Sequence, residues 1–297
     1  MTKISSRVAD LIFNGFLIVF FAIMIFITVY PFWNLSVISF NDPLDSIKGE
    51  LYFWPRKFTT VSYTTIFNTS NLLLATTNSV LRTVIGTVAN VFCSTLIAFA
   101  LSRKDFVLRK FMNRFIVFTM YITAGLIPTF ILYRDLQMLN HFSVYILPNL
   151  ISAYNIIIIR TYMQELPASL SEAATIDGAG DSQILFRIII PLCLPVIATV
   201  TLFIAVWQWS AWQDTNFFAS SNDNLTTLQY EMKKILTSVN NFTDSQLQNL
   251  VSQGGVKATS ESLQAAMTLI ATLPILVIYP FLQKYFVKGV TIGAVKE

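Results

Sequence analysis

The chain has 297 residues, of which 54% are hydrophobic and only 12% are charged. Soluble domains carry about 25% charged residues, so this composition excludes a soluble core and indicates an integral membrane protein. The net charge of +4 does not indicate nucleic-acid binding, because the basic residues flank apolar runs and form no stripe.

Apolar runs follow one another along the chain, at residues 11–38, 72–101, 111–132, 144–159, 192–211 and 265–286. A bilayer core of about 30 Å takes about 20 helical residues. The fourth run reaches that length only if Arg160 to Met163 form a snorkelling end. We therefore expect an all-α polytopic membrane protein with about six transmembrane helices, forming a single domain over residues 1–297 with its core at 72–288.

The positions of Lys and Arg predict which loops are cytoplasmic, because cytoplasmic loops carry an excess of both. The short loop after the second run is decisive, since it carries Arg103, Lys104, Arg109, Lys110 and Arg114. We expect both termini and the polar stretch 164–191 to be cytoplasmic, and loop 215–264 to be external. The first run is too long for a signal peptide and is expected to be a retained span.

The polar stretch 164–191 predicts two short helices joined by a turn. Ser169 and Glu172 have the spacing of a capping box. Gly178 and Gly180 can adopt positive φ and end the first helix, after which Asp181 can cap the second. An apolar stripe on the second helix is formed by Ile184, Leu185, Ile188 and Ile189. The pattern is also consistent with an ordinary cytosolic helix-turn-helix.

The fifth run ends in VWQWSAWQDTNFF, where Trp207, Gln208, Trp209 and Trp212 combine flat apolar faces with an amide. Such a set matches sugar rings, whose C–H faces stack on aromatic rings while their hydroxyls need polar partners. An aromatic belt at the outer membrane interface is the equal alternative.

Two further residues are candidates for a substrate pathway. Asn155 lies in the fourth run, and an amide at membrane depth faces protein or a water-filled path. A hydrogen bond between helices is the alternative for Asn155. Tyr121, in the third run, is the second candidate.

Other apolar runs carry residues that predict local features. Gly125 and Pro128 predict a kink in the third run. Arg82, near the outer end of the second run, is expected to snorkel to the surface, and a place along the solute pathway is the alternative. Trp54, in the first external loop, predicts an interfacial anchor or a substrate contact.

Several chemical signals are absent from the sequence. No G-x-x-x-x-G-K-[ST] motif occurs, so no nucleotide-binding P-loop is expected. The single histidine, His141, and the separated Cys93 and Cys193 predict no metal centre. We expect neither enzyme activity nor a cofactor bound by this chain. An ion-driven secondary transporter, the alternative from another class, would need intramembrane carboxylates.

Two segments carry a resemblance to a known family. Glu172-Ala173-Ala174, then Gly178 and later Ile190, Leu194 and Pro195, resembles the EAA loop of binding-protein-dependent ABC importer permeases. The ending PFLQKYFVKGVTIGAVK is similar to that of the maltose-type second permease. The resemblance covers nearly all of the chain and favours the branch that imports polysaccharide fragments and oligosaccharides.

The resemblance implies the permease of a type I importer in a bacterial cytoplasmic membrane. Its partners would be a second, non-identical permease, two ATPase subunits that bind ATP and Mg, and an extracellular substrate-binding protein. The ATPase would be contacted by the coupling loop and by the tail 287–297. The coupling residues implied are Leu170, Glu172, Ala173, Ala174, Asp177, Gly178 and Gly180, and those in the tail are Gly289, Gly293 and Lys296. A permease for a non-sugar solute remains the alternative.

Overall fold

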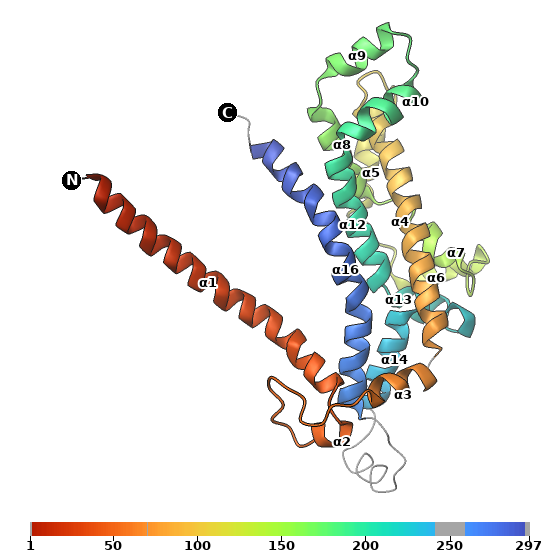
Figure 1. Cartoon of the computed structure of the whole chain (residues 1–297). Helices are drawn as coiled ribbons and strands as arrows, with labels where there is room; N and C mark the ends of the chain where they lie inside the picture. Colours follow the sequence, from red (N-terminus) through yellow and green to blue (C-terminus); the bar gives the residue numbers. More distant parts are fainter. Residues whose placement is uncertain (1, 70, 241–258, 295–297) are drawn as a thin grey trace. The chain divides into compact units, whose positions relative to one another are not determined.

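The computed structural model describes residues 2–69, 71–240 and 259–294 (Figure 1). Within these ranges the chain forms helices and loops without a β-strand, which confirms the all-α class; residues 41 and 58 form an isolated bridge. The chain divides into two compact units. Unit 1 comprises Met1–Ser70 and Lys234–Thr272, and unit 2 comprises Asn71–Lys233 and Leu273–Glu297.

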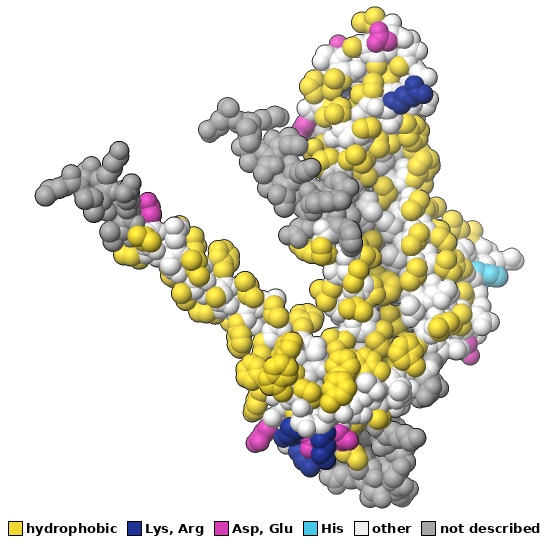
Figure 2. All heavy atoms as spheres, in the orientation of Figure 1, with side chains coloured by type: hydrophobic (Ala, Val, Ile, Leu, Met, Phe, Trp, Pro, Cys, Tyr) yellow, Lys and Arg dark blue, Asp and Glu magenta, His cyan; other side chains and the backbone are white. Residues whose placement is uncertain are grey.

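Unit 1 is dominated by the 38-residue helix α1 (Thr2–Ser39). Over Asp10–Ser39 none of its most apolar window is buried, and hydrophobic side chains cover its surface (Figure 2). A helix that is hydrophobic all round suits a lipid environment. Unit 1 also holds α3 (Val61–Thr69), the end of α14 (Leu228–Asn240) and the first part of α16 (Ser260–Ala294).

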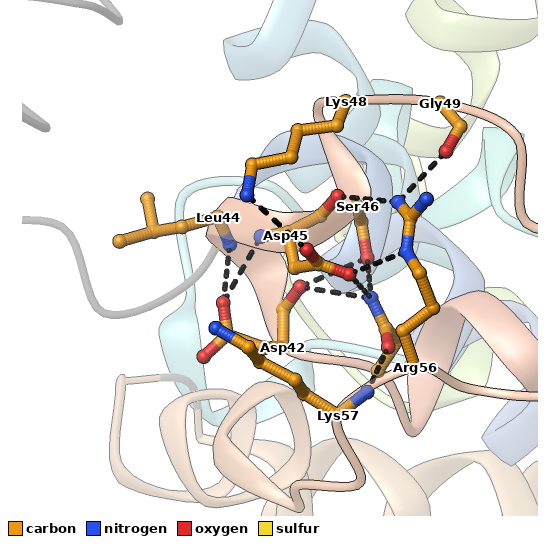
Figure 3. Close-up of polar contacts among 9 residues, drawn as sticks. Asp42, Leu44, Asp45, Ser46, Lys48, Gly49, Arg56 and Lys57 are labelled. Carbon is orange, nitrogen blue, oxygen red and sulfur yellow. Dashed lines mark hydrogen bonds and ion pairs between the residues drawn. The ribbon is translucent and has the colours of Figure 1, made fainter.

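The loop after α1 is organised by one carboxylate, that of Asp45 in the short helix α2 (Pro43–Ser46). Arg56 donates from Nε to Asp45 at 2.8 Å, Lys48 pairs with it at 3.4 Å, and Asn41 donates at 3.3 Å (Figure 3). The Arg56 hydrogen bond, followed by that of Asn41, lowers the pKa of Asp45 below its usual 3.8. At neutral pH the ionised carboxylate therefore ties α2 to the segment that carries Arg56.

Unit 2 contains the following helices and short helical turns. They are α4 (Leu72–Ser102), α5 (Arg109–Thr119), α6 (Leu126–Asp135), α7 (Ser143–Ile146), the 3₁₀ turn η1 (Leu147–Asn149), α8 (Ala153–Glu165), α9 (Ala168–Ile176), α10 (Asp181–Ile184), the π-helical turn η2 (Leu185–Ile189), α11 (Ile190–Leu192), α12 (Leu194–Ser210), α13 (Gln213–Phe218) and the 3₁₀ turn η3 (Asp223–Leu225), with parts of α14 and α16.

The centre of unit 2 is the packing of α4 against α8 and α12. The buried face of α4 carries small residues, including Gly86, Ser94 and Ala98. Small side chains let helix backbones approach closely, which is the usual mode of helix association in membranes. The apolar core is completed by residues such as Ile159 and Val200, both of which are fully buried. This packing fixes the relative positions of polar groups on the three helices.

The candidate spans among the described residues are of two kinds. Asp10–Ser39, Leu72–Ser102 and Glu261–Pro280 are each long and apolar enough to cross a membrane. Two bent helix pairs are long and apolar enough only together, and each is a broken span or a re-entrant loop: Ser143–Asn149 with Ala153–Glu165 at 46°, and Asp181–Leu192 with Leu194–Ser210 at 81°. The described residues thus hold three spans, or up to five if each bent pair crosses once.

The predicted third span, at 111–132, is broken instead of kinked. α5 ends at Thr119, and α6 begins only after Gly125, which has φ +80° and ψ 175°. That conformation lies outside the helical region and is open to glycine almost alone. Pro128 falls in the first turn of α6, where its missing N–H has little effect. The glycine, more than the proline, therefore divides this run.

The predicted coupling residues and the predicted pathway residues lie in different parts of unit 2. α9 and α10 lie at one end of α4 and α12, and α13 lies toward the other end (Figure 1). Loop residues near η3 are tied to α4, because Asn78 donates to the Asn224 carbonyl at 2.7 Å and Ser79 accepts from the Leu228 N–H at 2.9 Å. Each end therefore carries a separate candidate site.

Candidate functional site

The first site is the surface of α9. The helix begins after Pro167, whose φ of −58° already suits a helix start, and no side chain caps its first turn. The predicted capping box of Ser169 and Glu172 is therefore wrong, because both residues lie inside the helix. Their side chains are exposed.

The exposed face of α9 combines apolar, small and acidic side chains. Leu170 is 39% exposed and Ile176 is 86% exposed, while Glu172 and Ala173 are also exposed. Ala174 is buried at 8% and attaches the helix to the core of unit 2. Ile176 was not predicted from the sequence, although its spacing of three and four residues from Ala173 and Glu172 places it on their face.

The turn after α9 is closed by backbone hydrogen bonds. Gly178 has φ +81°, as predicted, and its N–H donates to the Thr175 carbonyl at 3.0 Å. The Ala179 N–H donates to the Ala174 carbonyl at 2.9 Å, which satisfies a carbonyl at the helix end. Asp177 is the C-cap residue. Gly180 has φ −75°, so the positive φ expected for it is not found.

Asp181 connects this loop to the end of α4. It was expected to cap α10, but it is the first residue of α10 and its side chain caps no N–H. Its carboxylate instead lies 3.2 Å from the guanidinium of Arg103, the C-cap residue of α4. Arg103 also contacts Asp105, whose pKa is lowered first by a hydrogen bond to its own backbone and then by Arg103. The ion pair offers a mechanical link between the loop and α4.

The apolar stripe of the second helix holds the loop in place, as predicted. Ile184, Leu185 and Ile189 are no more than 5% exposed, and Ile188 is half-buried. A cleft of about 920 Å³ lies beside α9, lined on one side by Ser171, Glu172, Thr175 and Ile176 and on the other by residues 99–109. α9 is thus a projecting helix on a firmly packed base.

The second site is a cavity of about 370 Å³ among α4, α8 and α12, which we call the amide cavity. Its walls are Asn90, Asn149, Ile151, Ser152, Asn155, Phe203, Ile204, Trp207 and Gln208. Asn90 donates to the Asn149 carbonyl at 2.5 Å and accepts from Asn155 at 3.4 Å and from Ser94 at 3.0 Å. These hydrogen bonds join α4 to α8 and to η1, which confirms the interhelical hydrogen bond that was the alternative for Asn155, and a contact of Asn155 with a solute stays a prediction.

A second cavity of about 440 Å³, the aromatic cavity, shares Asn149 and Trp207 with the first. Its other walls are Tyr133, Val144, Pro148, Ser210, Ala211, Trp212, Gln213, Asp214 and Phe218. Trp207 is 51% exposed and forms part of both cavities. Trp207 is therefore a wall residue common to the two cavities.

Arg82 lies behind the aromatic cavity and does not snorkel, contrary to the expectation. The residue is 0% exposed, and its guanidinium donates to Asp214 at 2.5 Å and to Gln208 at 3.1 Å. Its Cζ lies 4.5 Å from the centre of the Tyr145 ring. A charge is tolerated in such a place because a carboxylate and further acceptors satisfy it. Arg82 therefore binds α4 to the region where α12 ends.

The other residues predicted for the pathway are dispersed. Gln208 is 0% exposed and faces the amide cavity with its side chain bonded to Arg82. Trp209 is 6% exposed and lines neither cavity. Trp212 does not share a helix face with Trp209, because α12 ends at Ser210. Tyr121 is 83% exposed in the break between α5 and α6, away from both sets of walls.

Several residues of the cavities were not found from the sequence, among them Asn90, Asp214 and Tyr133. Asn90 lies mid-run in the second apolar stretch, and the rule applied to Asn155 would have found it. Asp214 and Tyr133 become neighbours only through the fold. In the tail, Gly289 and Gly293 belong to α16, and Lys296 lies outside the described residues.

Chemically, the cavity walls can donate and accept hydrogen bonds and can stack on rings. Among the described residues, no group of three His, Cys, Asp or Glu side chains gathers where it could hold a metal ion. The arrangement is suited to passing a polar solute with flat apolar faces, such as a saccharide.

Comparisons with known proteins agree with this geometry. Residues 90–292 match the family described as binding-protein-dependent transport system inner membrane component. The polygalacturonan/rhamnogalacturonan transport system permease protein YtcP of Bacillus subtilis (strain 168) is 34% identical over 98% of this chain and 99% of its own length. Protein LplC of the same organism is 33% identical over 91% of this chain and 90% of its own length.

A solved structure is also similar. It is the crystal structure of a bacterial ABC transporter involved in the import of the acidic polysaccharide alginate, and it matches with a TM-score of 0.82 and 28% identity. The match covers 94% of this chain and 98% of that one. The chain therefore belongs to the family of binding-protein-dependent transport system inner membrane components, and is a membrane permease of an ABC importer.

Proposed function

We propose that the chain is the permease through which an oligosaccharide, delivered by an extracellular binding protein, crosses the cytoplasmic membrane of a bacterium. The observation that carries the proposal is the presence of two sites on one packed unit. A projecting helix with Glu172 and Ile176 exposed lies at one end, and two neighbouring cavities walled by amides and indoles lie away from it.

The substrate class is supported by both chemistry and relatives. Indole faces and carboxamides are the groups that complement the C–H faces and hydroxyls of sugars. Similar transport systems include a polygalacturonan/rhamnogalacturonan permease and an importer of the acidic polysaccharide alginate. A carbohydrate is accordingly proposed here in preference to a peptide, an amino acid or an ion.

The energy would come from partners. In this proposal two ATPase subunits bind ATP and Mg, and α9 inserts into a groove of one of them through Leu170, Glu172, Ala173 and Ile176. The tail with Gly289, Gly293 and Lys296 would reach the same ATPase dimer. A second, non-identical permease would complete the path. Both termini would be cytoplasmic, on the side of α9.

Motion would pass from α9 to the cavities through rigid contacts. The Arg103–Asp181 ion pair and the buried Ile184, Leu185 and Ile189 attach the loop to α4 and to the core around it. Closing the ATPase dimer would displace α9, and the packed helices would follow as a body. The cavities between α4, α8 and α12 would then open alternately to either side of the membrane.

The coupling role is tested by Glu172→Lys and Gly178→Pro. The first reverses a charge on the exposed face of α9, and the second forbids the φ of +81° at its end. Both are expected to abolish oligosaccharide uptake in membrane vesicles while the variants still insert in the membrane. ATP hydrolysis should continue without transport.

The matched control is Glu165→Lys, which makes the same change at an exposed residue at the end of α8, outside α9. It should leave uptake close to that of the wild type. Normal uptake by both test variants would refute the role of α9 in coupling.

A further inference from the structure

The aromatic cavity differs from the amide cavity in the character of its walls. Rings of Trp207, Trp212, Tyr133 and Phe218 surround it, and the Tyr133 and Phe218 ring centres lie 4.9 Å apart. The Nζ atom of Lys233 lies 5.3 Å from the centre of the Trp212 ring. The Trp212 indole and the Tyr133 and Phe218 rings, which are held by these contacts, form flat apolar surfaces with little conformational freedom to lose on binding.

Among the described residues that line this cavity, Asp214 is the one with a charged side chain. Its side chain is 14% exposed, whereas that of its partner Arg82 is 1% exposed. The carboxylate of the ion pair therefore lines the cavity, whereas the guanidinium is buried and is not part of the cavity wall. Arg82 donates to both carboxylate oxygens, at 3.2 and 2.5 Å, which fixes their direction.

A carboxylate fixed in this way retains acceptor capacity. An ionised carboxylate has about four lone-pair sites, and Arg82 uses only part of them. The hydroxyls of a sugar ring are donors that match the remaining sites, and the exposed amide of Gln213 lies on the same wall. A second carboxylate brought close to Asp214 would meet like-charge repulsion, which is strong where water is scarce.

We propose that the aromatic cavity is a binding subsite for an uncharged pyranose ring of the transported oligosaccharide. The ring stacks on the indoles and donates hydroxyl hydrogen bonds to Asp214, and a uronate ring is disfavoured. Arg82 is a positioning residue, because it acts only by orienting Asp214. This inference rests on the proposed function, and it adds the chemical class of the ring accepted at one place in the path.

The test uses two sugars that differ at one carbon: methyl galactopyranoside, which has a C6 hydroxymethyl, and methyl galacturonide, which has a C6 carboxylate. Saturation-transfer NMR with the purified complete transporter in lipid nanodiscs reports direct binding of each, without the binding protein. The wild type should give a stronger signal for the neutral sugar, and Trp212→Ala should weaken its affinity by about tenfold.

Asp214→Asn gives the discriminating result. The change removes the negative charge and leaves the buried Arg82 cation without its counterion, so binding should shift toward the uronate. Trp33→Ala is the matched control, since Trp33 lies in unit 1, is 43% exposed and lines neither cavity. Its preference for the neutral sugar should equal that of the wild type.

Co-elution with the ATPase subunits shows that each variant is assembled. If Asp214→Asn does not assemble, Trp212→Ala and Gln213→Ala decide the matter, because both change groups at the cavity wall. Equal binding of the two sugars by the wild type would overturn the subsite, and so would undiminished binding by both wall variants. ATP-driven oligosaccharide uptake is measured in parallel: its absence in the wild type refutes the proposed function, whereas its presence without the sugar preference refutes only the subsite.

Discussion

Single residues decide how closely α4 and α12 approach. Gly86 faces the side chain of Gln208, and a Cβ atom added at residue 86 would overlap the Gln208 amide. Gln208 accepts hydrogen bonds from Arg82 and donates one to the Tyr145 carbonyl at 3.4 Å. The missing side chain of one residue therefore makes room for the amide that connects three elements.

Replacing Gly86 by alanine should destabilise the protein. The added methyl group forces Gln208 from its position, and overpacking of a filled core costs about 1–3 kcal/mol. The thermal unfolding midpoint of the purified protein in detergent should fall. Gly15→Ala is the control, because nothing lies within 4 Å of a Cβ added there. Equal midpoints for the two variants would contradict this account of the contact.

Some residues of the two cavities and of the ion pair beside them can be predicted from the sequence, and others cannot, for a physical reason. Trp207 and Asn155 could be named because a polar or amphipathic group at membrane depth needs a partner. The partner itself could not be named: Arg82 was expected at the surface, but Asp214 lies 132 residues later in the chain and neutralises it. The spacing of neighbouring residues in the sequence does not predict a contact between two residues that are so far apart in the chain.

At the scale of elements, glycine geometry explains where helices end. Gly178 ends the turn after α9, and Gly125 separates α5 from α6, both with positive φ. The sequence predicts the first case, since the surrounding stretch is polar. It underestimates the second, because an unbroken apolar run reads as one helix and the φ of a glycine cannot be read from its neighbours.

Gly125→Ala should show that the break between α5 and α6 depends on this conformation. An L side chain at φ +80° and ψ 175° is strained by about 1–3 kcal/mol. The unfolding midpoint should fall, measured as for Gly86. Gly180→Ala provides the comparison, since φ −75° is open to alanine. A fall of the same size in both would mean that backbone strain is not the cause.

For the whole molecule, the charge distribution predicts the side of the membrane on which each loop lies. Composition and apolar runs were enough to predict an all-α membrane protein, because a bilayer requires long apolar helices. They were not enough to predict the bends of 46° and 81°, which depend on the packing of α7, α8, α11 and α12.

The proposed orientation can be checked with single cysteines. In a variant without Cys93 and Cys193, we place one cysteine at Ile176, 86% exposed, or at Trp54, 73% exposed. A membrane-impermeant maleimide should label Trp54→Cys in intact cells and Ile176→Cys only after permeabilisation. Labelling of Ile176→Cys in intact cells would place α9 outside and refute the proposed coupling.

The π-helical turn η2 affects which insertions and deletions this chain can tolerate. Its five residues, Leu185–Ile189, lie between α10 and α11, so they connect the α9 loop to the span that carries Trp207. A π-helical turn holds one residue more than the α-helical turn that it replaces, because its hydrogen bonds run from i to i+5. Removing one residue there would restore an α-helical turn and leave the elements on either side nearly in place, whereas removing one residue from a regular α-helix rotates what precedes it by about 100° around the helix axis. A single-residue deletion should therefore be tolerated better in this turn than in the α-helices beside it.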